Sequence, residues 1–92
     1  MIVRISGEGQ YELADEEKAP LNELENAVVS AVEGRREDGF EECFAKLLDY
    51  VRGRGRRVPD DELEGSDLIL PPPDLTFAEA GREFTGEGLI PD

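Results

Sequence analysis

The sequence predicts an α+β domain, in which a small antiparallel sheet packs on an antiparallel helical hairpin and is followed by a short C-terminal helix and an extended tail. Two observations carry this prediction. Apolar residues recur at helical spacing in both halves of residues 21–53, and β-branched and aromatic residues alternate with polar ones in residues 1–13. With 92 residues, the chain is close to the lower size limit for a self-sufficient core, so we expect a single domain.

Residues 21–53 contain the two predicted helices. Their apolar stripes consist of Leu21, Leu24, Val28 and Val32, and then of Phe40, Phe44, Leu47, Leu48 and Val51. A short polar connection separates the stripes, so they can bury each other only in an antiparallel hairpin. Pro20 suits the first turn of a helix, and Gly34 suits a left-handed closing residue. Asp38 with Glu41 resembles a capping box that begins the second helix.

Residues 1–13 are predicted to form a β-hairpin. Its strands are Ile2–Ile5 and residues 10–13, and residues 6–9 supply two glycines for the turn. Leu68–Leu70 is a predicted third strand, which the prolines at 71–73 end. We expect the sheet to bury one set of side chains against the helices: Val3, Ile5, Tyr11, Leu13 and Ile69.

Residues 58–92 are predicted to hold an acidic extended segment, the short strand, a short helix and a tail. Thr76 and Glu79 have the spacing of a capping box, and Phe77, Ala80 and Phe84 would share one face of the helix that follows. Gly81 weakens this helix by about 1 kcal/mol relative to alanine.

The formal charge of −13 is spread unevenly. Residues 58–92 contain ten acidic side chains and one basic side chain, whereas the positive spot consists of Arg52, Arg54, Arg56 and Arg57. Such a field repels nucleic acid and anionic lipid and favours a basic partner. Solubility alone is the other explanation for this charge. No apolar run is long enough to span a membrane, and one cysteine fits a reducing compartment, so we expect a cytoplasmic protein.

Catalytic motifs are scarce. The chain has no histidine, which excludes His-based triads and the commonest general base. Cys43 has acidic and aromatic neighbours and no visible cation to activate a thiolate, so we interpret it as a core residue. The acidic run Asp60, Asp61, Glu62, Glu64 and Asp67 lacks the pattern of a calcium loop, although it could bind a hard cation weakly. We therefore predict no enzymatic activity, no cofactor and no metal.

Three blocks of sequence resemble the PspA-associated protein family, PspAA. They are residues 1–13, residues 59–63 continuing to 66–72, and residues 86–91. The resemblance implies a small accessory protein that works with phage-shock protein A. That partner is a coiled-coil, membrane-remodelling protein of the ESCRT-III superfamily, which guards the cytoplasmic membrane under envelope stress. The family supplies no catalytic residues, and Gly81 departs from its pattern.

The resulting prediction is a homodimeric adaptor that binds phage-shock protein A and is recruited through it to the inner face of the membrane. Homodimerisation is expected because so small a core leaves apolar surface uncovered. The candidate contacts are Glu8, Tyr11, Asp60, Asp61, Glu62 and Asp67, with Arg54, Arg56 and Arg57 as a second spot. Two alternatives stay open: a nucleic-acid-binding regulator that uses residues 52–57, and a hydrolase or metal-dependent enzyme that works through carboxylates.

Overall fold

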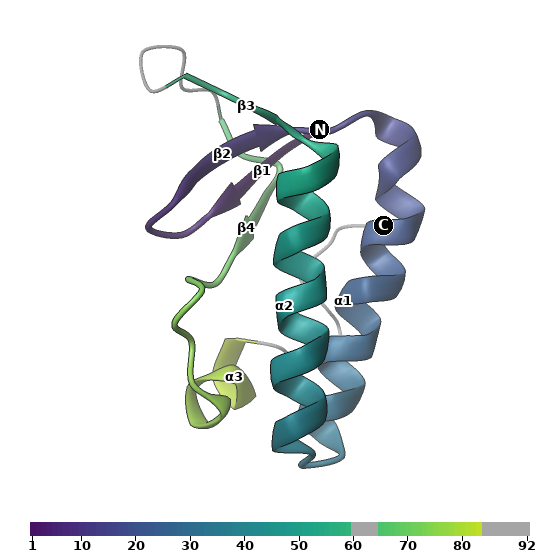
Figure 1. Ribbon diagram of the computed structural model, residues 1–92, viewed down its shortest axis with the longest axis vertical. Coiled ribbons are helices and arrows are strands. Elements are labelled where there is room, and N and C mark those ends of the chain that lie inside the picture. The colour runs from purple at the N-terminus through teal and green to yellow at the C-terminus, as the bar shows by residue number, and fades with distance from the viewer. Residues whose placement is uncertain (60–64, 84–92) are drawn as a thin grey trace.

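The protein is a mixed α+β domain, as the sequence predicts, and the computed structural model describes residues 1–59 and 65–83 (Figure 1). The two long helices lie side by side, with the sheet against one end of the pair and the short third helix near the other. In chain order the elements are β1 (Ile2–Ile5), β2 (Gly9–Glu12), a 3-10 turn (Asp15–Glu17), α1 (Lys18–Glu33), α2 (Glu37–Arg54), β3 (Arg56–Arg57), β4 (Leu68–Leu70) and α3 (Phe77–Glu83).

The sheet has the strand order β3-β2-β1-β4 and is mixed. β1 and β2 form the predicted antiparallel hairpin, and β3, a strand of two residues, adds to the edge of β2. β4 pairs with β1 as predicted, but in the parallel direction. The prediction of a purely antiparallel sheet was therefore wrong. The chain leaves β3 at one edge of the sheet and reaches the opposite edge before β4 begins, and this crossover allows β4 to run in the same direction as β1.

The prediction that Ile69 is buried was also wrong, because its side chain is 58% exposed. Leu68 is paired with Val3 and Leu70 with Ile5 in the β1–β4 register. Paired residues share a face of the sheet, so Leu68 and Leu70 join the core and Ile69 lies on the outer face.

The helical hairpin is confirmed, and both of its apolar stripes face the core. Pro20 lies in the first turn of α1, where its missing N–H has no intrahelical partner to lose. Gly34 was predicted to be the left-handed residue that closes α1. In the structure that residue is Arg35, with a φ of 55°. Gly34 still donates its N–H to the Ser30 carbonyl oxygen at 2.9 Å, so the helical hydrogen bonding continues through it and the chain reverses one residue later.

The start of α2 differs from the prediction as well. The helix begins at Glu37, so Asp38 lies inside the first turn instead of capping it. Arg36 occupies the N-cap position without a side-chain cap, and its carbonyl oxygen accepts the N–H of Phe40 at 2.8 Å.

The capping box of α3 is confirmed. The Thr76 hydroxyl accepts the Glu79 N–H at 3.2 Å, and the Glu79 carboxylate accepts the Thr76 N–H at 3.1 Å. Ala80 is buried and Phe77 packs at the border of the core. Two predicted features lie outside the described residues, namely the place of Phe84 on this helix and the tail.

The core joins one face of the sheet to the hairpin. Its buried members are Val3, Ile5, Tyr11, Leu13, Leu21, Val28, Val29, Ala31, Phe40, Phe44, Leu47, Leu48, Val51, Leu68, Leu70 and Ala80. Phe40 lies at its aromatic centre, stacked on Phe44 at 5.4 Å between ring centroids and edge-on to Phe77 at 5.8 Å. This aromatic group therefore links α2 to α3.

Two glycines near the end of α2 should respond oppositely to alanine. A Cβ at Gly53 would meet no atom within 4 Å, so Gly53→Ala should raise the free energy of unfolding by about 0.5–1 kcal/mol through helix propensity. A Cβ at Gly55 would lie 2.7 Å from the Val51 carbonyl oxygen and 2.9 Å from Tyr11 Cβ, so Gly55→Ala should destabilise the protein. Urea denaturation of both variants tests this pair, and equal effects would contradict it.

Candidate functional site

A polar network joins the β1–β2 turn to the last turns of α2. Glu8 projects from the turn, where Gly7 adopts a φ of 78°. Its carboxylate accepts hydrogen bonds from the Tyr11 hydroxyl at 2.7 Å and from Arg52 Nε at 2.8 Å, and a second Arg52 nitrogen donates at 2.5 Å. This bidentate pair spans 44 positions of sequence and fixes the sheet against the helix.

The network shifts the ionisation of all three groups. The hydrogen bonds from Arg52 lower the pKa of Glu8 from 4.5 to about 2, against the opposing effect of partial burial. The pKa of Tyr11 is raised, first by burial and then by its hydrogen bond to the Glu8 carboxylate. Glu8 likewise raises the pKa of Arg52. At neutral pH the network therefore contains a carboxylate, a guanidinium and a neutral phenol.

The arginines of the predicted basic spot contact other groups of the same chain. Arg57 donates to the Glu8 carbonyl oxygen at 2.9 Å, and its guanidinium lies 5.6 Å from the centre of the Tyr11 ring. Arg56 forms an ion pair with Glu12 at 3.0 Å. The Arg54 guanidinium lies 5.6 Å from the centre of the Tyr50 ring, and the Tyr50 hydroxyl in turn donates to Glu17.

The structure thus brings some of the predicted contact residues together and separates others. Glu8, Tyr11 and Arg57 share one network. Asp67 lies elsewhere, next to the start of β1, where its carboxylate accepts the Ile2 N–H at 2.8 Å. Asp60, Asp61 and Glu62 are outside the described residues.

Sequence reasoning missed two buried polar side chains. Glu25 on α1 is completely buried, and Gln10 on β2 donates to the Ser66 hydroxyl at 2.8 Å. A signal for Glu25 was present, because it follows Leu21 by four residues and precedes Val28 by three, which places it on the buried face of the helix. Gln10 gave no such signal, since it lies on the outer face of the sheet.

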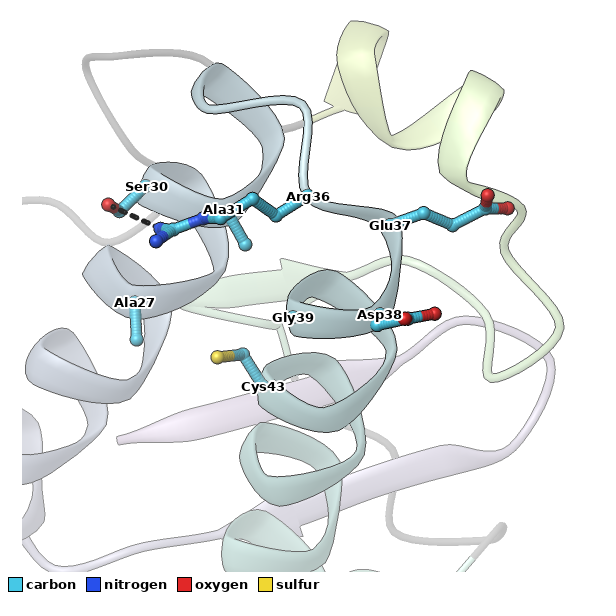
Figure 2. Close-up of a pocket in the computed structure, with 8 residues that line it drawn as sticks. All are labelled: Ala27, Ser30, Ala31, Arg36, Glu37, Asp38, Gly39 and Cys43. Atoms are coloured by element: carbon cyan, nitrogen blue, oxygen red, sulfur yellow. Dashed lines mark hydrogen bonds between the residues drawn. The ribbon is translucent and has the colours of Figure 1, made fainter.

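An open hollow of about 740 Å³ lies at the loop end of the α1–α2 hairpin (Figure 2). Its floor is made of small residues, Ala27, Ala31 and Gly39, and the Cys43 side chain points into it. Arg36 reaches across it toward the Ser30 hydroxyl at 3.4 Å. Figure 2 shows that the Glu37 side chain, which belongs to the rim, points away from this hollow toward α3.

Residues 1–59 and 65–83 present neither a cluster of metal ligands nor a helix suited to crossing a membrane. Within these ranges, no group of three or more Cys, Asp or Glu side chains is arranged to hold a metal ion. In the same part of the chain, no helix combines the length and apolar character that crossing a bilayer requires.

The fold and its contacts define a small α+β domain, in which a mixed sheet is attached to a helical hairpin by an apolar core and by an Arg–Glu–Tyr network. The model of one protein family, described as PspA-associated protein, matches residues 1–92. The chain belongs to this family, PspAA, and the resemblance seen in its sequence is confirmed. No curated protein and no solved structure matches the chain.

Proposed function

We propose that this protein is a non-enzymatic adaptor, which binds a phage-shock protein A homologue and modulates its assembly or its engagement with the membrane during envelope stress. The observation that carries the proposal is the family match over residues 1–92, since the family is described by its association with PspA.

Charge supports the same proposal. With a formal charge of −13, the protein is repelled by anionic lipid surfaces and is attracted to basic segments of other proteins. An acidic adaptor in the cytoplasm would therefore reach the inner face of the membrane through its partner. Electrostatic attraction of this kind speeds association and weakens as salt is added.

The nucleic-acid alternative receives no support from the contacts of the arginines. Arg52 and Arg56 pair with carboxylates, Arg57 donates to a backbone carbonyl, and Arg54 lies over an aromatic ring. We therefore expect no mobility shift with DNA or RNA, and a shift abolished by Arg54→Ala, Arg56→Ala and Arg57→Ala together would revive this alternative.

Self-association is part of the proposal. Ile69 leaves an apolar side chain on the outer face of a small sheet, and two-fold dimers are the commonest protein assembly. Light scattering should give twice the monomer mass of 10.2 kDa. A monomer at micromolar concentration would remove the dimer from the proposal without affecting the adaptor role.

Binding to the partner is tested by mixing the purified chain with a purified phage-shock protein A homologue from the same organism. We expect the two proteins to co-elute on a sizing column. We also expect the affinity measured by calorimetry to fall about tenfold or more between 50 and 500 mM salt, because added salt shortens the screening length. Absence of binding at low salt would overturn the proposal. Turnover of a substrate by the chain alone would contradict its non-enzymatic part.

A further inference from the structure

A second groove, of about 430 Å³, lies between α2 and the segment that leads into α3. Three aromatic residues line it: Phe40 and Phe44 are buried and stack on each other, and the Phe77 ring lies edge-on to that of Phe40. Phe77 and Leu75 are half-buried, so apolar surface remains open to the groove. Ala45, an exposed helical residue, forms part of the α2 wall.

Three carboxylates line this apolar groove. Glu37 and Glu41 lie one helical turn apart on α2, and Asp74 belongs to the facing segment. Like charges at this helical spacing repel each other, so the arrangement does not stabilise the helix. Within the described part of the chain, no cation forms an ion pair with any of the three.

Other carboxylates of the domain form ion pairs with basic side chains of the same chain. Glu8 pairs with Arg52 at 2.5 Å, Glu12 with Arg56 at 3.0 Å, and Glu42 with Lys46 at 3.1 Å. The groove thus combines apolar surface with three carboxylates that form no ion pair among the side chains the structure describes. Its charge and its shape both complement a long basic side chain.

We propose that this groove binds an arginine or lysine side chain presented by a protein partner. The aliphatic stem of that side chain would lie on the half-buried Leu75 and Phe77, and its charged head would reach Glu41 and Asp74. Such a basic side chain cannot come from residues 84–92, which contain neither arginine nor lysine. The identity of the partner as a phage-shock protein A homologue rests on the proposed function.

The hollow at the loop end of the hairpin fits this occupant less well. Arg36 already reaches across it, and its floor consists of alanine and glycine with no aromatic ring. Glu37, which borders both cavities, directs its carboxylate away from the hollow (Figure 2) and contributes to the groove.

Two exposed alanines provide a matched test of the two cavities. Ala45→Arg should fill the groove with an arginine of its own and weaken binding of the phage-shock protein A homologue about tenfold, as measured by calorimetry. Ala27→Arg places the same side chain in the hollow of Figure 2 and should leave the affinity unchanged. The opposite ranking, or equal affinities for both variants, would overturn the assignment to the groove.

Neutral variants separate local charge from net charge. The triple variant Glu37→Gln, Glu41→Gln and Asp74→Asn should bind the homologue less tightly and with a weaker salt dependence. A control with the same net charge is Glu16→Gln, Glu23→Gln and Glu33→Gln, whose side chains are exposed and lie outside the groove. Thermal unfolding of both triple variants verifies that each is folded. Equal binding by the two would contradict the proposal.

A small probe tests the groove independently of the partner. In a nitrogen–proton correlation spectrum of the full chain, N-acetyl-arginine methylamide should shift the amide signals of Glu41, Ala45 and Thr76. The neutral analogue N-acetyl-citrulline methylamide should not. If the homologue fails to bind but the arginine probe shifts these signals, the result contradicts the adaptor role and supports the assignment of the groove. If the homologue binds and the probe shifts none of them, the result contradicts the assignment of the groove.

Discussion

Replacing Phe40 with alanine is expected to lower the free energy of unfolding by about 3–5 kcal/mol, the range typical of large core truncations. Its side chain is only 1% exposed, and its ring contacts both Phe44 and Phe77. Small domains have a total stability of about 5–15 kcal/mol, so this single change removes a large fraction of it. Urea denaturation followed by circular dichroism at neutral pH measures the loss.

Phe77→Ala is the natural comparison. Phe77 is half-buried and lies on the short helix α3, so its truncation should cost less than that of Phe40. An equal or greater cost at Phe77 would contradict the placement of Phe40 at the aromatic centre of the core.

Replacing Glu8 with glutamine is expected to cost about 1–2 kcal/mol at neutral pH, and this cost should depend on pH. The pKa of Glu8 is about 2 in the folded protein and 4.5 in the unfolded reference. The stabilisation is therefore complete above about pH 4.5 and is lost as the pH falls toward 2. Because the Glu8 side chain is 22% exposed, solvent and salt reduce the full linkage value of roughly 3 kcal/mol.

A double-mutant cycle isolates the pair. Glu8→Gln, Arg52→Gln and the combined variant, measured by urea denaturation at pH 7 and again near pH 2.5, should show coupling that shrinks on acidification. The more exposed pair Glu12–Arg56 serves as the control and should couple by less than about 0.5 kcal/mol. Coupling of Glu8 and Arg52 that is no larger than that of the control would contradict the role of the network.

The parts of the fold that depend on residues close together in the sequence could be predicted. The stripes from Leu21 to Val32 and from Phe40 to Val51 have the period of a helix, and a short connection leaves the antiparallel hairpin as their one way to bury each other. The capping pair Thr76 and Glu79 marked the start of α3 for a similar reason, since its two hydrogen bonds connect residues three positions apart.

The candidate site could be predicted less well from the sequence. Glu8, Tyr11 and Arg57 were predicted as contacts for a partner, and nothing in the sequence indicated that they contact one another and Arg52 within the chain. No sequence pattern relates Glu8 to Arg52 across 44 positions. The aromatic groove was missed for the same reason, because Asp74 approaches Glu37 and Glu41 only once α3 has packed on α2.

The sequence by itself determined the helices, the β-hairpin, the acidic character and the family of this protein, because each of these depends on neighbouring residues or on composition. The tertiary structure alone decided the parallel direction of β4, the outward position of Ile69 and the pairing of the arginines with the chain's own carboxylates. These features depend on contacts between segments distant in sequence. Shifting a strand by one residue would reverse the faces of all its side chains without changing its local pattern.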